Sequence, residues 1–273
     1  MNAIPRSYLF VPGHRAERFD KALASGADAV VLDLEDAVAP DDKPRARAAI
    51  AAWWAMQPPA LHARVVVRSN DAASPAFIDD LALLARLGVG GVMLPKAEAA
   101  TQVAMVRAAL PAVSVLALVE SALGVARVDE VASAPGVTRL VFGTLDFALD
   151  LGIDIATDAS GLVHAASRIA IASRVAGLPL PVAGVTPEID DEARLLADLA
   201  AARALGFGAK LCIHPSQVAP LHRALMPSDA DLDWARRVLA ADLASPGAAR
   251  LDGRMVDRPV VLRAQRLLAL ATH

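Results

Sequence analysis

The sequence predicts a (β/α)8 TIM barrel, an α/β fold, with an extra C-terminal helical tail. Eight apolar runs rich in branched residues alternate with helical sequence, and this alternation is typical of barrels built from strand–helix units. Continuous apolar runs of this kind indicate strands that are buried on both faces. The length of 273 residues fits one such barrel or two smaller domains. A doubly wound open sheet is the alternative, because periodicity does not distinguish a closed sheet from an open one.

The first half of the chain contains four of the predicted strand–helix units. Strands are expected at residues 7–11, 29–34, 63–67 and 91–94. Helices are expected between and after them at about residues 16–25, 41–56, 74–88 and 98–110. Asp41 is the candidate N-cap of the second helix, Pro58-Pro59 stop that helix, and Gly88 ends the third.

The second half contains the remaining four units and the tail. Strands are expected at residues 114–119, 139–142, 181–185 and 209–213. The intervening helices are expected to end near residues 133, 176 and 205, with a longer loop after the sixth strand. We therefore predict a catalytic barrel over residues 1–225 and a helical extension over 226–273. Because a barrel does not need this extension, we expect it to pack on a neighbouring subunit.

Composition excludes several classes of function. Net charge is −3, with 27 basic and 30 acidic residues, so no basic field points to nucleic acid. The single cysteine, Cys212, rules out an intrachain disulfide and a cysteine-built zinc site. The N-terminal residues lack a basic region followed by an apolar one, and no apolar run approaches the roughly 20 residues that span a bilayer. The sequence predicts a cytoplasmic protein without a membrane partner.

Charged side chains follow most of the predicted strands. Because the C-terminal ends of barrel strands meet at one mouth, where barrel enzymes place their chemistry, we expect these side chains to converge there. They are Glu35, Asp36, Arg68, Lys96, Glu120, Asp146 and His214. Each of them taken alone has a structural explanation, and the convergence is the stronger signal.

Glu120 and Asp146 are the candidate metal ligands. They follow two neighbouring predicted strands, and Mg²⁺ prefers one or two carboxylates together with water and substrate oxygens. The alternative is that each acid caps the helix after it, because acidic residues favour the first turn. Gly143 precedes Asp146 and allows the backbone to turn tightly there.

The other strand-end residues have two possible roles each. Glu35 and Asp36 can hydrogen-bond metal-bound water or pair with Arg68 across neighbouring strands. Arg68 keeps its charge, so its functional use is to hold a carboxylate or a developing oxyanion. Lys96 is expected to be solvated or ion-paired rather than to form a Schiff base, and a lone histidine such as His214 is more often structural than catalytic.

Basic residues near the first helices are a further candidate group. Arg15, Lys21 and Lys43 begin or follow these helices, where they can meet an anionic ligand. Solvation at the surface is their default interpretation.

Eight short motifs, in order along the chain, resemble those of the citrate lyase β-subunit-like (CitE-like) family. This family belongs to the HpcH/HpaI aldolase superfamily and includes malyl-CoA and citramalyl-CoA lyases. The motifs are Tyr-Leu-Phe-Val-Pro-Gly (8–13), Val-Leu-Asp-Leu-Glu-Asp-Ala-Val (31–38), Val-Arg-Ser-Asn (67–70), Leu-Pro-Lys (94–96), Val-Glu-Ser (119–121), Phe-Gly-Thr-Leu-Asp (142–146), Ile-His-Pro-Ser-Gln (213–217) and Gly-Arg-Met-Val-Asp-Arg-Pro (253–259).

The resemblance implies roles for individual residues. Glu120 and Asp146 match the family's Mg²⁺ ligands, with Glu120 also at the substrate, and Arg68 matches its substrate-binding arginine. The positions that match substrate or CoA contacts are Phe10, Arg15 and Lys21. Phe10 stands where some relatives have tyrosine.

The resemblance also gives Asp257 a role that the residues alone do not suggest. In Met-Val-Asp-Arg-Pro it matches a catalytic aspartate that reaches the site of a neighbouring subunit. Without the resemblance, Asp257 is interpreted as a cap before Pro259 opens the last helix. A site shared between subunits would explain why the chain carries a tail that the barrel does not need, and it implies a homo-oligomer, a trimer or hexamer.

The resemblance implies a Mg²⁺-dependent lyase that cleaves or forms a 3-hydroxyacyl-CoA. Its small-molecule partners would be an acyl-CoA and an α-keto acid, with citryl-, malyl-, citramalyl- or hydroxymethylglutaryl-CoA as candidate substrates. One alternative is a class II pyruvate-type aldolase that works without CoA. Another is an accessory β subunit that acts inside a citrate lyase complex.

Overall fold

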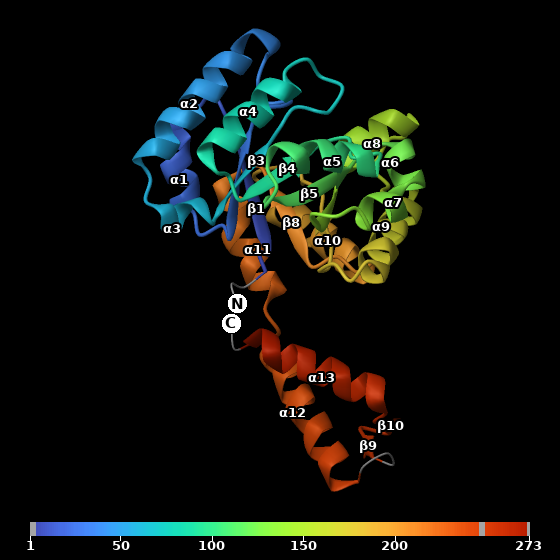
Figure 1. Cartoon of the computed structure of the whole chain (residues 1–273). Helices are drawn as coiled ribbons and strands as arrows, with labels where there is room; N and C mark the ends of the chain where they lie inside the picture. The colour runs from blue at the N-terminus through green and yellow to red at the C-terminus, as the bar shows by residue number, and fades with distance from the viewer. Residues whose placement is uncertain (1–3, 246–248, 272–273) are drawn as a thin grey trace. The chain divides into compact units, whose positions relative to one another are not determined.

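The computed structural model describes residues 4–245 and 249–271 and contains two compact units (Figure 1). The first unit comprises residues 4–221, and the second begins at His222. The division falls inside helix α11 (Val218–Leu225), four residues before the boundary expected from the sequence. Residues 1–3, which belong to the stretch inspected for a secretory signal, lie outside the described residues.

The first unit is a closed barrel of eight parallel strands in the order β1 to β8, which confirms the predicted fold class. The strands are β1 (Ser7–Pro12), β2 (Ala29–Asp33), β3 (Val65–Arg68), β4 (Gly91–Leu94), β5 (Ser114–Val119), β6 (Val137–Phe142), β7 (Val182–Ala183) and β8 (Ala209–Cys212). Closure is completed by the β1–β8 pair, where Tyr8 lies opposite Leu211. The open-sheet alternative is therefore excluded.

Helices surround the barrel on its outer side. They are η1 (Ala16–Arg18), α1 (Phe19–Ala24), η2 (Pro40–Asp42), α2 (Lys43–Met56), α3 (Pro59–His62), α4 (Phe77–Leu87), α5 (Ala100–Ala109), α6 (Ala122–Ala126), α7 (Val128–Ala132), α8 (Thr144–Leu151), η3 (Ser160–Leu162), α9 (Val163–Val175), α10 (Glu192–Ala204) and η4 (Pro215–Gln217). Gly88 ends α4 in the left-handed conformation with φ 64°, as predicted.

Two local predictions were wrong. Asp41 does not cap α2, because a 3-10 turn, η2, contains Asp41 and leads directly into that helix without a side-chain cap. The segment after β6 is not a loop at first, because α8 begins immediately after Gly143. This extra helix places Asp146 in the first turn of α8.

The barrel interior is packed with inward-facing strand residues. The buried cluster includes Val31, Met93, Leu118, Val141 and Leu211, with Phe10 packed against it. Successive side chains of a strand point to opposite faces, so every second strand residue lies inside the barrel and the others face the helices.

Both tryptophans of α2 are also buried. Trp53 packs edge-on against Phe19 with ring centroids 5.4 Å apart, and its indole N–H donates to Asp20 at 2.8 Å. Trp54 stacks on His62 with ring centroids 3.9 Å apart.

The second unit is built from two helices joined by a short hairpin. They are α12 (Asp229–Ala244), β9 (Arg250–Leu251), β10 (Arg254–Met255) and α13 (Arg258–Ala271). Its own small core consists of Ala235, Val238, Ala249, Val256 and Ala264. In the part of the chain that the structure describes, no helix combines the length and apolar character needed to cross a bilayer.

Candidate active site

The pairing of β2 with β3 builds the first part of the site. The register sets Asp33 opposite Arg68 at the C-terminal ends of the two strands. Arg68 donates from Nε and Nη2 to the two carboxylate oxygens of Asp33, both at 2.7 Å. Asp33 is 1% exposed and Arg68 is 8% exposed, so this bidentate ion pair is shielded from water. Asp33 was missed as a site residue, although an acid at the end of an apolar run was the signal.

The remaining nitrogen of Arg68 faces two further acids. Its Nη1 lies 2.9 Å from Glu35 Oε2 and 3.4 Å from Asp36 Oδ2, so both predicted partners are present. The guanidinium also lies over the ring of Phe10, 4.9 Å from its centroid. Burial lowers the pKa of Arg68, but the charge of Asp33 and its hydrogen bond outweigh burial and raise it. Arg68 is therefore a fixed cation at the mouth.

Glu35 connects Arg68 to Lys96. The Lys96 ammonium donates to Glu35 Oε1 at 3.0 Å, so Lys96 is ion-paired, as the sequence indicated. Glu35 Oε2 makes no hydrogen bond among the described residues, although it lies at ion-pair distance from Arg68. Burial raises the pKa of Glu35 to about 7, while Arg68 opposes that shift.

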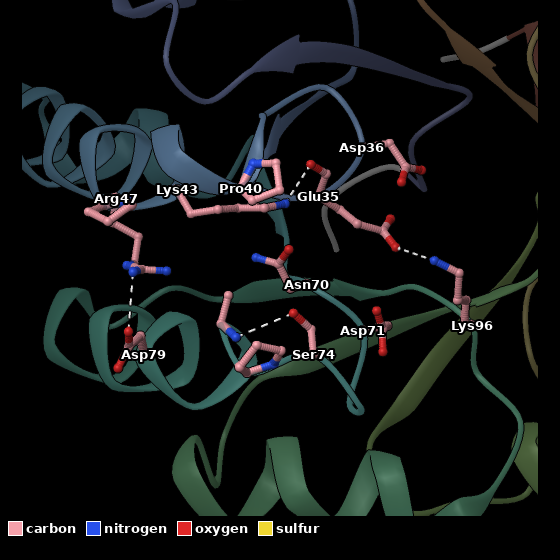
Figure 2. A pocket seen from close by; sticks show the side chains of 13 residues that line it. Glu35, Asp36, Pro40, Lys43, Arg47, Asn70, Asp71, Ser74, Asp79 and Lys96 are labelled. Atoms are coloured by element: carbon pink, nitrogen blue, oxygen red, sulfur yellow. Dashed lines mark hydrogen bonds and ion pairs between the residues drawn. The ribbon is translucent and has the colours of Figure 1, made fainter.

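Lys43 fixes the loop that carries Glu35. Its ammonium donates to the backbone carbonyls of Leu34 and Glu35, both at 2.7 Å. Figure 2 shows Lys43 reaching toward Glu35 from α2. The default interpretation of Lys43 as a solvated surface lysine was wrong, because the turn after β2 exposes carbonyls within its reach. Burial lowers the pKa of Lys43, and the acids nearby oppose this effect.

Glu120 follows β5 and is 3% exposed. Its Oε1 accepts a hydrogen bond from the backbone N–H of Lys96 at 2.9 Å. Lys96 holds a φ of 46°, a conformation that residues with a side chain rarely adopt and that clusters at functional sites. The strained backbone thus directs an N–H at Glu120.

Gly143 leaves room for the Glu120 carboxylate. A Cβ added at Gly143 would lie 2.4 Å from Glu120 Oε2 and 2.6 Å from Glu120 Cβ. The glycine is therefore required by close approach between the end of β6 and the Glu120 side chain. The tight turn proposed for this glycine leads directly into α8 and Asp146.

Asp146 contributes a second negative charge near Glu120. Burial raises the pKa of Glu120 to about 8, and the charges of Glu35 and Asp146 add to that shift. Negative charges that raise the pKa of a neighbouring carboxyl in this way favour a bound cation, which relieves the repulsion.

The donor set fits Mg²⁺ better than a metal held by the protein alone. No group of three or more histidine, cysteine or acidic side chains able to hold a metal occurs among residues 4–245 and 249–271. Two carboxylates, Glu120 and Asp146, leave most coordination positions to water and substrate, as Mg²⁺ sites do. The absence of a side chain at Gly143 also leaves the Glu120 carboxylate room to be placed for a metal ion.

A polar cavity opens beside these residues. It has a volume of about 530 Å³ and lies between the loop after β2 and the start of α4. Figure 2 shows Glu35, Lys96, Lys43 and Asn70 around it, with Arg47 paired to Asp79 at its edge. Lys96 and Glu35 therefore line a solvent-accessible space that a polar molecule can enter.

Several predicted site residues do not join this network. Arg15 pairs with Glu17 at 2.6 Å, and Lys21 is exposed on α1. No hydrogen bond or ion pair in the described parts of the chain links either of them to the network. His214 is exposed and caps η4 through Ser216, as a structural histidine would.

Asp257 belongs to the C-terminal unit. It is exposed, and its Oδ1 accepts a hydrogen bond from the N–H of Val260 at 3.1 Å. It therefore caps the start of α13, which agrees with the structural interpretation. A catalytic role in a neighbouring subunit stays a prediction.

The fold and the site together define a (β/α)8 barrel that brings two acids, Glu120 and Asp146, and a fixed arginine to its mouth. Comparison with known proteins gives the family. The model of the HpcH/HpaI aldolase/citrate lyase family matches residues 6–215, and the chain belongs to this family. The resemblance seen in the sequence motifs is thereby confirmed.

Individual relatives cover almost the whole chain. A citrate lyase subunit beta-like protein of Mycobacterium tuberculosis is 38% identical, over 99% of this chain and 97% of that protein. A (3S)-malyl-CoA thioesterase of Cereibacter sphaeroides is 33% identical, over 97% and 94%. The crystal structure of CitE from M. tuberculosis in complex with magnesium, acetoacetate and coenzyme A matches with a TM-score of 0.90 and 37% identity, over 100% of both chains.

Proposed function

We propose that this protein is a Mg²⁺-dependent carbon–carbon lyase that acts on a 3-hydroxyacyl-CoA. It cleaves that thioester into an acyl-CoA and an α-keto acid, or joins the two in reverse. The observation that carries the proposal is the meeting of the buried Glu120 with Asp146 and the fixed cation Arg68 at one barrel mouth. Candidate substrates are citryl-, malyl- and citramalyl-CoA, and also hydroxymethylglutaryl-CoA, whose cleavage would give a β-keto acid instead.

The ligands of related structures support this substrate class. CitE from M. tuberculosis was crystallised with magnesium, acetoacetate and coenzyme A, and separately with magnesium and pyruvate. A citrate lyase beta subunit of the same organism contains oxaloacetate and magnesium. These ligands are keto acids and a CoA carrier, which are the two halves of a 3-hydroxyacyl-CoA after cleavage.

Glu120 and Asp146 would hold the Mg²⁺. When bound, the cation supplies a Lewis acid that polarises an oxygen of the keto acid. Arg68 is locked to Asp33 through Nε and Nη2, and its Nη1 faces Glu35 and Asp36. A substrate oxygen would therefore bind Nη1 by sharing it with these acids or by displacing one of them. That nitrogen would stabilise negative charge on a substrate oxygen without reorganising, because Asp33 already fixes the guanidinium plane.

The proton must be moved by a further group, and Asp257 of a neighbouring subunit is the candidate. In the cleavage direction it would accept the proton of the substrate hydroxyl as general base. The bond between the hydroxyl-bearing carbon and the thioester α-carbon then breaks, and its electron pair passes to the thioester. The hydroxyl carbon becomes the ketone of the α-keto acid, and protonation of the α-carbon completes the acyl-CoA.

The assembly would be a homo-oligomer, a trimer or hexamer, working in the cytoplasm. The need for Asp257 in trans is what requires more than one subunit. The substrate or its CoA part would meet Arg15 just before η1, Lys21 on α1 and Phe10 within β1. Lys21 is exposed and Arg15 is partly exposed, so phosphates can reach both, and at Arg15 they would compete with Glu17.

A thioesterase is the second candidate, because a (3S)-malyl-CoA thioesterase is 33% identical over 97% of this chain. Hydrolysis would release free CoA and malate, whereas the lyase reaction leaves the thioester intact. The proposal also competes with a class II pyruvate-type aldolase and with an accessory β subunit of a citrate lyase complex. Product analysis distinguishes all four.

The direct experiment incubates purified protein with Mg²⁺ and each of the four candidate CoA thioesters. We expect one of them to yield an acyl-CoA and a keto acid, detected by chromatography, and EDTA to abolish the reaction. Release of free CoA without a keto acid would identify a thioesterase. Cleavage of a free hydroxy-keto acid but of no thioester would identify an aldolase, and the absence of any turnover would favour the accessory subunit.

A mixing experiment tests the shared site. Asp257→Ala and Glu120→Ala are each expected to be inactive, and Asp257→Ala should still bind Mg²⁺. Co-assembled subunits of the two variants should regain partial activity, because some sites receive one intact residue from each chain. Full activity of Asp257→Ala alone would contradict the role in trans.

A further inference from the structure

A second cavity lies outside the barrel core, between the strands and the helices that surround them. It has a volume of about 680 Å³ and is lined by residues of β6, β7 and β8 and of helices α8, α9 and α10, which Figure 1 labels except for β6 and β7. Most of its lining is aliphatic or aromatic, and its members include Leu145, Ala148, Leu149, Ala166, Val185 and Phe207. The volume is within the range of small-molecule pockets.

One charged side chain from β8 enters this cavity. Ala209 and Leu211 belong to the barrel core, so Lys210 between them points outward, toward the helices. Lys210 lines the cavity and is 2% exposed. Its ammonium donates to the carbonyl of Gly184 at 2.7 Å.

The Lys210 ammonium has no counter-ion among the described residues. Its only recorded hydrogen bond is the one to Gly184, and no carboxylate of residues 4–245 and 249–271 forms an ion pair with it. Asp198 is near enough to favour the charged form, but its two oxygens accept hydrogen bonds from Thr186 at 2.6 Å and Arg194 at 2.8 Å. Burial lowers the pKa of Lys210 to about 8.

An ammonium carries three N–H donors, and one of those of Lys210 is used. A buried charge is costly unless it is paired. The cavity therefore combines a cation that lacks a partner with walls that favour hydrocarbon. A ligand that satisfies both features has one acceptor group, negatively charged, at the end of an apolar chain.

Acidic residues near the cavity restrict the ligand further. Asp154 accepts a hydrogen bond from Ala156 N at 2.9 Å, and Asp158 accepts one from Ser160 N at 2.8 Å. Both acids are exposed and line the cavity. Glu188 also lines the cavity, and the one arginine in the lining, Arg194, is paired with Asp198. The acids therefore oppose a second negative group on a ligand, and a polyanion such as CoA fits poorly.

We propose that this cavity binds an aliphatic monocarboxylate, with its carboxylate at Lys210 and its chain along α8 and α10. The site is separate from the one assigned to the lyase reaction and uses neither Mg²⁺ nor Arg68. A failure of the lyase assignment would leave it untouched.

The experiment is isothermal titration calorimetry of the full chain without Mg²⁺ or CoA. Butyrate, hexanoate and octanoate are compared, because each added pair of methylenes should tighten binding roughly tenfold if the chain is buried. Octanedioate, with a carboxylate at each end, should bind at least about tenfold more weakly than octanoate. Equal affinity along the series, or no heat with octanoate at millimolar concentration, would overturn the proposal.

Two variants locate the ligand. Lys210→Met keeps the length of the side chain and should weaken octanoate binding by at least about tenfold, while Lys21→Met, a matched change at an exposed lysine, should not. Leu149→Asp changes a residue that is 80% exposed at the cavity, so folding tolerates it. It should also weaken octanoate, and Leu149→Asn should do so less. Unchanged affinity in both Lys210→Met and Leu149→Asp would refute the location.

Discussion

Replacing Gly143 by alanine tests the metal half of the site with a single methyl group. The new Cβ would lie 2.4 Å from Glu120 Oε2 and 2.6 Å from Glu120 Cβ, whereas ordinary contacts begin near 3.4 Å. Gly143 has φ −85°, which alanine adopts without strain. The substitution therefore acts through Glu120 and not through the backbone of β6 or α8.

The size of the effect follows from the displacement. Relief of the clash needs a movement of Glu120 by about 1 Å, and a misplacement of that size can reduce turnover about 100-fold. Overpacking of a filled site costs about 1–3 kcal/mol of stability. We expect Mg²⁺ affinity to fall at least about tenfold, because a carboxylate displaced from its position no longer completes the ligand set.

The assay is calorimetric titration with Mg²⁺, accompanied by urea unfolding without metal. Gly90→Ala is the matched control, because a Cβ at Gly90 meets nothing within 4 Å and its φ is not positive. It should behave as the wild type. If Gly143→Ala bound Mg²⁺ and turned over like the wild type, the assignment of Glu120 as a ligand would be refuted.

Three further predictions concern the polar network and the buried lysine. Asp33→Asn should destabilise the protein by about 3–5 kcal/mol in urea unfolding, because it removes the charge that pairs with the buried Arg68; a loss below about 1 kcal/mol would contradict this. Lys43→Met should cost about 1.5–3 kcal/mol and loosen the backbone at Glu35, seen as faster amide hydrogen exchange there; unchanged exchange would show that the loop holds without it. The pKa of Lys210 falls from 10.5 in the unfolded chain to about 8 in the folded one, so wild-type stability gains from this group as pH rises between those values. Lys210→Met lacks this titration. The free energy of unfolding of the wild type should therefore rise relative to that of Lys210→Met by about 1.4 kcal/mol per pH unit above pH 8, measured in parallel denaturation series. A difference that does not change with pH would exclude the shift.

The barrel was predictable from the sequence because its strands are buried on both faces. Runs such as 115–119 are continuously apolar and need no tertiary information to be recognised. The helix α8 was missed because Gly143 and the turn before Asp146 resemble a loop, and no cap signal marks its start. The boundaries of β7, only Val182–Ala183, depend on pairing with its neighbours rather than on composition.

Part of the candidate site was predictable from the sequence, namely which strand-end residues lie together, but the contacts between them were less so. Convergence at the barrel mouth follows from topology, so Glu35, Arg68 and Glu120 could be grouped in advance. The pairing of Asp33 with Arg68 depends on the β2–β3 register, which one residue of slip would abolish. The reach of Lys43 to loop carbonyls depends on how the turn after β2 folds, and periodicity carries no information on that.

The distribution of charge at the mouth decides where a cation binds. The connected acids and bases of the mouth are Asp33, Glu35, Asp36, Glu120, Asp146, Arg68 and Lys96. Both bases form ion pairs with acids other than Glu120 and Asp146. Arg68 pairs with Asp33 and Glu35, and Lys96 pairs with Glu35. In the described chain, the recorded hydrogen bond of the Glu120 carboxylate comes from a backbone N–H and not from a cation. A buried carboxylate in that position is stable when it is protonated or bound to a cation. Because Asp146 adds negative charge near Glu120, the unbalanced charge lies at these two acids, and we expect a divalent ion to bind there rather than beside Arg68.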